Sequence, residues 1–484
     1  MKKPRERTEK DPLGERKLPA GVYYGIQTLR ASENFPISAI PPKREFIRAT
    51  AVIKRAAADV NTRLGLLPGK KGRAIMKASG EVIAGRFDGY FIVDVYQAGA
   101  GTSHNMNANE VIANRAVELL GGKKGDYRLI HPNDHVNMAQ STNDVFPTAM
   151  RLAAVESSNA LLKTLHALTI AFAGKARLFD RVIKSARTHL QDAVPIRMGQ
   201  EFLSYAECMG KCGKRIEKAR EGLKTLGIGA TAAGTGLNSH PGYRSLMVKK
   251  LSEITGIMDL RPAPSMPEAI NSMADFVEFS GALKALAIEL IRIANDLRLL
   301  SSGPRTGIAE IKLPGVQPGS SIMPGKINPV MAEMLNMVCF QVIGNDLTVT
   351  MASQAGQLEL NVMTPVINYN ILQSIEILKN GAGAFLKRCV RGIKADEKRC
   401  RYYFERSAGL ATVLNPLIGY AKASEVAKDA MERRLTIREI ILEKGLLTKK
   451  ELDKILDPMR VTGPQLKGKR GIKRRSGSCD GGAP

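Results

Sequence analysis

Long segments without proline dominate the middle of this sequence and predict long helices. Each segment follows one of five prolines: Pro147, Pro195, Pro267, Pro329 and Pro365. Because proline is favoured in the first turn of a helix and disfavoured in its interior, each of these prolines is a candidate helix start. Five such helices in one chain predict an elongated helical bundle.

The segment after Pro267 has the periodicity of one long helix. Its apolar residues recur at steps of three and four, which places them on one face: Ile270, Met273, Phe276, Val277, Leu283, Leu286, Leu290, Ile293, Leu297 and Leu300. Alanines and isoleucines such as Ala287 and Ile291 widen that face. A helix of about 30 residues is roughly 45 Å long, and a broad apolar face on such a helix predicts packing between subunits.

The flanks of the bundle have a different character. We expect a mainly α-helical chain with a mixed N-terminal domain (1–142), a central five-helix domain (143–398) and a small helical C-terminal domain (399–463). In the last of these, Thr436–Glu439 and Thr448–Glu451 match capping boxes at helix starts. The final segment, 464–484, is rich in glycine and basic residues and is typical of disorder.

The formal net charge of +26 is unusual and attracts anions, such as nucleic acid, acidic lipid or small carboxylate and phosphate substrates. The basic tail has no aromatic residues to stack on bases, which favours a solubilising role over nucleic-acid binding. No window approaches the roughly 18 unbroken apolar residues of a membrane span. The charged start, MKKPRERTEKD, lacks the apolar stretch of a secretory signal. We therefore expect a cytoplasmic protein without membrane contact.

Cysteine and histidine spacing does not indicate a metal site. The six cysteines form no CxxC pair and no Cys/His zinc pattern, so we expect packing thiols in a reducing compartment. His131 and His135 are four residues apart, but Pro132 follows the first histidine where an HEXXH-type zinc site needs glutamate.

Four polar stretches interrupt the helical pattern: GAGTSHNMN (99–107), HPNDHVNMAQSTND (131–144), RTHLQDAVPIRMGQ (187–200) and GSSIMPGKINP (319–329). Taken singly, each could be a polar loop or a set of helix caps. Together they supply many uncharged donors, which bind carboxylates without the cost of burying several charges. His189, beside Thr188 and Gln191, fits either a polar site or a structural role.

These four stretches together resemble the aspartase/fumarase superfamily. GSSIMPGKINP resembles its signature loop, and SSIMPGK is typical of the branch that contains aspartate ammonia-lyases and class II fumarases. The similarity extends from about residue 11 to residue 458. It implies a homotetramer of three-domain subunits with a central twenty-helix bundle, in which each active site is built from three chains. It implies no metal and no organic cofactor.

Most of the distinguishing residues resemble aspartases. Ser103, Thr142 and Leu190 stand where fumarases typically have glutamine, serine and threonine, and AGQLELNVM (355–363) lacks the aromatic residue that fumarases have before ELN. In the other direction, HPND (131–134) resembles the second dicarboxylate site of fumarases, and Thr364 replaces a glutamate that is common in aspartases. The expected reaction is elimination of ammonia from L-aspartate to give fumarate. The alternative is class II fumarate hydratase, which releases water from L-malate.

A non-catalytic structural or nucleic-acid-binding protein on the same fold is a third interpretation, which the net charge encourages. It conflicts with the presence of the residues that the chemistry needs, namely Ser320, Lys326, Asn328, Thr188 and His189.

The resemblance implies roles for the residues that hold the substrate. One carboxylate, which becomes a doubly charged aci-carboxylate when the neighbouring carbon loses its proton, needs donors placed around it. The residues implied for it are Thr102, Ser141, Thr142 and Ser321. The residues implied for the other carboxylate are Lys326, Asn328 and Thr188, with the lysine supplying a fixed positive charge.

The resemblance also implies the catalytic groups. Ser320, the first serine of the pair, would be the general base, and backbone amides of the loop together with Lys326 would lower the pKa of its hydroxyl. His189 and Asn143 would lie near the amino group or steady the nearby hydroxyls. Glu333 either orients His189 or is an ordinary carboxylate in the first turn of a helix. Closure of the loop over substrate would exclude water.

Overall fold

The structure, a computed structural model, describes residues 5–464. The chain divides into two compact units. Unit 1 contains residues up to 171 together with 205–299 and 313–392, and unit 2 contains 172–204, 300–312 and the residues from 393 onward. The predictions for the tail after residue 464 and for Cys479 fall outside the described residues. The three expected domain boundaries stay predictions.

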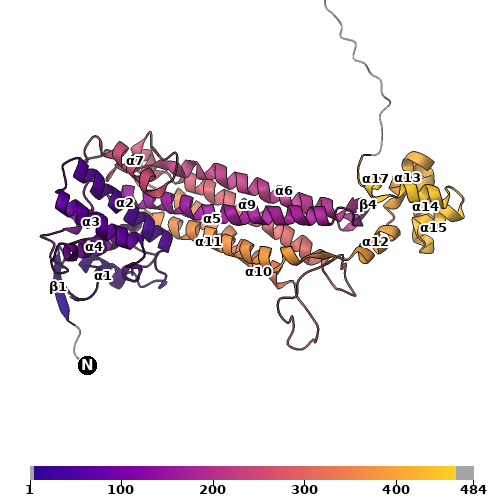
Figure 1. The fold of residues 1–484 in the computed structure, drawn as a ribbon, viewed down its shortest axis with the longest axis horizontal. Coiled ribbons are helices and arrows are strands. Elements are labelled where there is room, and N and C mark those ends of the chain that lie inside the picture. The colour runs from indigo at the N-terminus through magenta and orange to yellow at the C-terminus, as the bar shows by residue number, and fades with distance from the viewer. Residues whose placement is uncertain (1–4, 465–484) are drawn as a thin grey trace, which may run out of the picture. The chain divides into compact units, whose positions relative to one another are not determined.

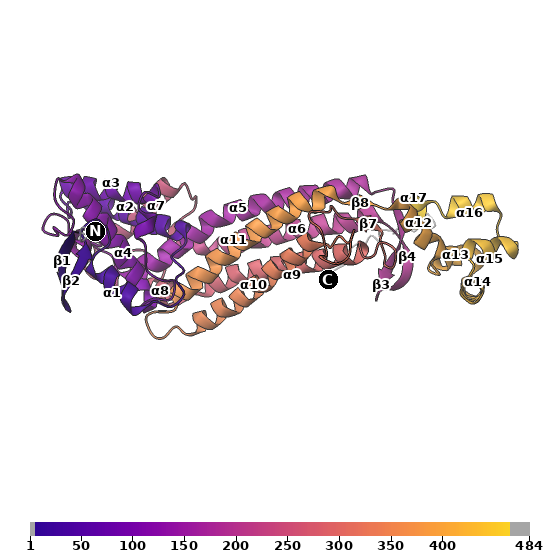
Figure 2. The same cartoon turned by 90° about the horizontal axis from the view of Figure 1, so that it is seen from below.

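Five long helices confirm the mainly helical fold. They are α5 (Thr142–Leu178), α6 (Met198–Arg220), α9 (Ala274–Leu300), α10 (Val330–Gln354) and α11 (Thr364–Arg388). In unit 1, α5, α9, α10 and α11 run side by side (Figures 1 and 2). The apolar face predicted for α9 is buried, with Leu283, Leu286 and Leu290 at most 1% exposed. None of the helices within residues 5–464 has the length and apolar character that crossing a bilayer requires.

The prolines mark helix starts less regularly than the sequence predicts. Pro329 is the N-cap residue of α10, and Pro365 lies in the first turn of α11. The helix predicted from Pro267 is instead two helices, because α8 (Met266–Asn271) ends before α9 begins. Pro147 lies inside α5, near enough to its start that few intrahelical hydrogen bonds are lost. Pro195 lies in a strand, three residues before α6.

The N-terminal part of unit 1 packs short helices around a compact core. Its elements are β1 (Glu6–Asp11), β2 (Gly14–Pro19), α1 (Ile26–Asn34), α2 (Arg44–Arg63), α3 (Gly69–Ile83) and α4 (Thr102–Leu119). Apolar side chains of α3 and α4, including Ile75, Val111 and Ile112, form the core of this region. α7 (Tyr243–Thr255) packs against α2, and β5 (Thr225–Leu226) pairs in parallel with β6 (Arg261–Pro262).

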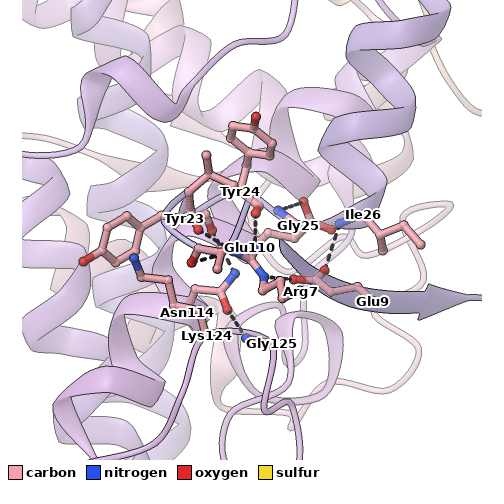
Figure 3. Close-up of polar contacts among 12 residues, drawn as sticks. Arg7, Glu9, Tyr23, Tyr24, Gly25, Ile26, Glu110, Asn114, Lys124 and Gly125 are labelled. Carbon is pink, nitrogen blue, oxygen red and sulfur yellow. Dashed lines mark hydrogen bonds and ion pairs between the residues drawn. The ribbon is translucent and has the colours of Figure 1, made fainter. Parts of the chain in front are cut away.

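A buried glutamate of α4 holds the start of α1 (Figure 3). Glu110 Oε2 accepts from the backbone N–H of Gly25 at 2.8 Å and of Thr28 at 3.1 Å, and from the Thr28 hydroxyl at 2.6 Å. Glu110 Oε1 accepts from the N–H of Gln27 at 2.9 Å. Three backbone N–H groups that the start of α1 leaves without an intrahelical partner, and one hydroxyl, therefore meet one carboxylate.

Replacing Glu110 with glutamine is expected to destabilise the protein by about 2–4 kcal/mol, because the amide nitrogen cannot accept and leaves buried donors unpaired. Thermal unfolding followed by circular dichroism measures this loss. Glu118→Gln is the matched control on the same helix, because the Glu118 side chain is partly exposed. An equal loss in both variants would contradict the special role of Glu110.

Unit 2 contains a hairpin and a cluster of short helices. The hairpin is β3 (Ile183–Thr188) with β4 (Gln191–Arg197), and β7 (Ile311–Lys312) pairs with β8 (Lys394–Ala395). The helices are α12 (Glu397–Arg406), α13 (Leu410–Ile418), α14 (Tyr420–Arg433), α15 (Ile437–Glu443), α16 (Lys449–Ile455) and α17 (Pro458–Val461). Both predicted capping boxes are present, at Thr436 and Thr448.

Candidate active site

The first polar stretch ends in the first turns of α4, which begins at Thr102. The backbone turns sharply just before it. Gly101 has φ +84°, and a Cβ there would lie 2.1 Å from the Phe146 ring, so only glycine fits. The N-cap residue has no side chain to cap the helix, and Gln97 Oε1 accepts from the N–H of His104 in the first turn at 2.8 Å. The positive end of the helix dipole favours an anion beside the exposed Thr102.

The second stretch leads into the start of α5. The N–H of Asn143 donates to Ser141 Oγ at 3.2 Å, and the Asn143 amide donates to the carbonyl of Ala232 at 2.7 Å. The buried Asp144 carboxylate accepts from the N–H groups of Ser141, Gly229 and Thr231, each at 3.0 Å. Ser141, Thr142 and Asn143 are therefore held in place by the helix start and by the loop that contains Ala232.

Asn105 joins the two helix starts. Its amide donates to Thr142 Oγ1 at 3.1 Å and to Asn137 Oδ1 at 3.2 Å. Asn105 is one turn beyond Thr102 on α4, so this bond brings the Thr102 and Thr142 regions together. Behind them lies Lys54 of α2, whose Nζ donates to Asn137 Oδ1 at 2.8 Å and to Gln140 Oε1 at 3.1 Å.

Burial shapes the electrostatics behind these helix starts. Burial lowers the pKa of Lys54 to about 7, and the negative charge of Asp144 opposes this shift. Burial raises the pKa of Asp144 to about 6, against the backbone hydrogen bonds and the Lys54 charge. Burial and the charge of Lys54 lower the pKa of His104 to about 3. His104 is therefore neutral at physiological pH.

The third stretch is not a polar loop, because it runs from the end of β3 through the hairpin tip and β4 into the first residues of α6. Thr188 pairs with Gln191, which leaves His189 and Leu190 as a two-residue turn. Both have positive φ (55° and 60°), as in a type I′ turn, at a cost of about 1–2 kcal/mol for each residue without glycine. The tip is exposed, and Leu190 is 68% accessible.

A buried ion network holds the stem of this hairpin. Lys184 Nζ lies 2.7 Å from Glu310 Oε2 and 2.9 Å from Glu201 Oε1, and Arg187 Nη1 lies 2.8 Å from Glu310 Oε1. Because Lys184 and Arg187 belong to β3, this network fixes the strand that leads to Thr188 and His189.

The fourth stretch is a self-contained loop before α10. Ser320 Oγ accepts from the backbone N–H of Ile322 at 3.2 Å and of Met323 at 3.0 Å. Two amides aimed at one hydroxyl oxygen favour its alkoxide form. Ser320 and Lys326 line the same open pocket of about 510 Å³. Ser321 is exposed on the same loop.

Gly319 closes this loop. Its N–H donates to the carbonyl of Lys326 at 2.8 Å, and its own carbonyl accepts from the Asn328 amide at 2.7 Å. A Cβ at residue 319 would lie 2.5 Å from the Lys326 carbonyl oxygen, so the closure requires glycine. Glu333 follows in the first turn of α10.

Within one chain, the loop and the two helix starts lie far apart. The loop precedes α10, whereas the other end of α10 leads to Val362, whose carbonyl accepts from the N–H of Ala100 at 2.7 Å. Asn361 ties this turn to α10 by donating to the carbonyl of Ala352. A helix of this length spans roughly 37 Å. Thr102 and Thr142 therefore lie at one end of α10 and Ser320 at the other.

Comparison with known proteins assigns this chain to a family. Residues 14–344 match the family model described as lyase, and residues 410–463 match that described as fumarase C C-terminus. The aspartate ammonia-lyase of Bacillus subtilis (strain 168) is 51% identical over 97% of this chain and 98% of its own length. That of Escherichia coli (strain K12) is 48% identical over 96% and 98%. The chain belongs to the aspartase/fumarase superfamily.

Solved structures of this superfamily share the fold. The fumarate lyase:delta crystallin from Brucella melitensis bound to cobalt has a TM-score of 0.93 at 50% identity, covering 95% of this chain and all of its own. The class II fumarase from Schistosoma mansoni has a TM-score of 0.90 at 38% identity, covering 94% and 99%.

The HPND segment, which resembles a second dicarboxylate site of the superfamily, lies apart from the two helix starts. His131 is the N-cap of the short π-helix η3 (Pro132–Val136) and accepts from the N–H groups of Asn133 and Asp134 at 3.2 Å. It lines a pocket of about 660 Å³ that also contains the basic side chains Lys10, Lys123, Lys124 and Arg128. Within residues 5–464, no three His, Cys, Asp or Glu side chains gather in a way that suits a metal ion.

Sequence reasoning missed the residues behind the site. The burial of Lys54 could have been predicted from the sequence. Lys54 lies at helical spacing from Ile47, Ala51 and Ala58, which form a buried stripe. The loop that receives Asn143 and Asp144, residues 229–232, carried no comparable signal because it contributes backbone groups.

Proposed function

We propose that this protein is an aspartate ammonia-lyase, which converts L-aspartate reversibly to fumarate and ammonia. The observation that carries the proposal is the high identity to aspartate ammonia-lyases over nearly the whole chain, 51% against 38% for the class II fumarase. The aspartase-like residues Ser103, Thr142 and Leu190 support it. The proposed chemistry uses only side chains and backbone amides. The proposed location of the protein is the cytoplasm.

Ser320 is the proposed base. Its oxygen removes a proton from the carbon beside one substrate carboxylate, and the electrons move into that carboxylate to form the aci-carboxylate. The aci-carboxylate accepts hydrogen bonds from Thr102, Ser141, Thr142 and Ser321. The electrons then return, the carbon–nitrogen bond breaks and ammonia leaves. The two N–H groups that point at Ser320 Oγ support this role because they stabilise the alkoxide.

The remaining candidates hold the rest of the substrate. Lys326, Asn328 and Thr188 bind the second carboxylate, and the fixed charge of the lysine suits a dianion. His189 and Asn143 lie beside the amino group. Glu333 is the proposed orienting partner of His189.

We further propose a homotetramer whose active sites are each built from three chains. The separation along α10 supports this arrangement, because one chain alone cannot bring Ser320 to Thr142. A row of exposed apolar residues on α10 supports it too: Met337, Phe340, Leu347 and Met351 follow the three- and four-residue spacing of a helix–helix seam. The opposite side of α10 is buried within the chain, at Val342 and Val349, so the exposed row is the face that is left for a partner helix.

The purified protein is expected to produce fumarate from L-aspartate, followed by ultraviolet absorbance, and to leave L-malate essentially unchanged. The matched assay with L-malate tests the alternative, fumarate hydratase, which shares the base and both carboxylate sites. Rapid turnover of L-malate with none of L-aspartate would overturn the proposed function in favour of that alternative.

A further inference from the structure

Lys54 is buried without a carboxylate partner. It is 0% exposed, and its Nζ donates to two side-chain amide oxygens, those of Asn137 and Gln140. No ion pair within residues 5–464 includes it. An ammonium in such surroundings is costly, since burial disfavours its charged form. A lysine retained here needs a reason beyond packing, which a methionine of similar length would satisfy.

The contacts of Lys54 give a direction to a chain of hydrogen bonds. A side-chain amide presents either an acceptor or a donor, whereas the ammonium form of Lys54, which a pKa of about 7 leaves populated at neutral pH, only donates. Lys54 therefore holds Asn137 with its oxygen inward, and the Asn137 nitrogen donates to the carbonyl of Gln140 at 3.1 Å. That oxygen also accepts from Asn105, so Asn105 turns its nitrogen toward both Asn137 and Thr142.

The direction of this chain decides what Thr142 can do. Because Thr142 Oγ1 accepts from Asn105 at 3.1 Å, its own hydrogen is left to donate elsewhere. If Asn105 were reversed, its oxygen would compete for that hydrogen. A carboxylate beside Thr142 needs a donor.

We propose that Lys54 is a positioning residue which fixes the direction of the Asn137–Asn105–Thr142 chain and so keeps the Thr142 hydroxyl a donor to the substrate carboxylate. This role rests on the proposed function, in which Thr142 binds the carboxylate that becomes the aci-carboxylate. It predicts effects on both binding and turnover, because the same hydroxyl donates more strongly as charge develops.

The test compares Lys54→Met with the double variant Lys54→Met/Asn137→Leu in the full chain. The double variant replaces both partners with apolar groups, which is less disruptive than leaving one unpaired. Lys224→Met is the matched control, a buried lysine that pairs with Glu221 and Asp259 outside this chain of hydrogen bonds. Light scattering and circular dichroism establish assembly and folding, and isothermal titration with succinate measures binding without turnover.

Both Lys54 variants are expected to bind succinate at least about tenfold more weakly than the parent and to lose at least about tenfold in kcat for L-aspartate. The single and the double variant are expected to lose similar amounts, because a second break in the same series of hydrogen bonds adds little. Lys224→Met is expected to stay within about threefold of the parent.

A folded Lys54→Met or double variant with parental succinate affinity and kcat would overturn the role of Lys54. Failure of the proposed function is distinguishable from this outcome. A parent that acts on L-malate instead of L-aspartate would still bind succinate, a dicarboxylate without an amino group, so the binding comparison would stand.

Discussion

Replacing Ser320 with alanine is expected to lower kcat for L-aspartate by at least about 10²–10⁴-fold, the range typical for loss of a general base. The oxygen that receives two backbone amides at 3.0 and 3.2 Å is then missing, and with it the proposed acceptor for the substrate proton. Binding is expected to survive better than turnover, because the residues proposed to hold the second carboxylate are unchanged: Lys326, Asn328 and Thr188. Steady-state kinetics with circular dichroism to confirm folding measure the split between kcat and KM.

Two comparison variants separate the base from the shape of the loop. Ser320 also forms the turn, because its hydroxyl accepts from residues two and three positions ahead. Asparagine forms the same kind of turn with its side-chain oxygen but cannot act as the base. Ser320→Asn is therefore expected to be as inactive as Ser320→Ala. Lys326→Ala is expected to act mainly on KM, because it removes the fixed charge. Near-parental kcat in Ser320→Asn would show that the hydroxyl only shapes the loop.

The long helices could be predicted from the sequence because their signals are local. Apolar spacing along residues 274–300 requires only a helix with one buried face, and the structure buries that face. The capping boxes at Thr436 and Thr448 were predictable for the same reason, since each involves residues three apart. Pro147 misled because it lies in the second turn of α5, so it marks the region of a helix start and not its first residue.

The hairpin of residues 183–197 could not be read from local signals. Its two-residue turn is His189–Leu190, where type I′ turns favour asparagine and glycine. The stem depends on Lys184 and Arg187 meeting Glu310, which is remote in sequence. A strained turn held by a distant ion network is a tertiary feature, and such strain is often found at functional sites.

The candidate site was predictable in its parts but not in its arrangement. Hydroxyl and amide residues in the four polar stretches, with the family resemblance, indicated which side chains to consider. Their positions at the starts of α4 and α5, and the separation of Ser320 from them along α10, depend on how the helices pack. Lys54 was missed because a lysine in a helix is ordinarily exposed.

Two inactive variants are expected to restore activity to each other when they share a tetramer. One chain carries Ser320→Ala, and the other carries Thr102→Val together with Thr142→Val. Because these residues lie at opposite ends of α10, the proposed site takes its loop from one chain and its helix starts from another. Random mixing then leaves about a quarter of the sites with neither change, so activity is expected to rise from near zero to about a quarter of the parent.

The control mixes a chain carrying Ser320→Ala with a chain carrying Lys326→Ala. Ser320 and Lys326 line one pocket in one loop, so every site receives one change or the other, and activity is expected to stay at the level of the separate variants. The measurement is the specific activity of co-expressed, affinity-separated mixed tetramers with L-aspartate. Recovery in the first mixture no greater than in the control would contradict active sites shared between chains. Recovery in the first mixture alone would link the length of α10 to catalysis. The helix separates Ser320 from Thr102 and Thr142 within one chain, so these residues would belong to different active sites.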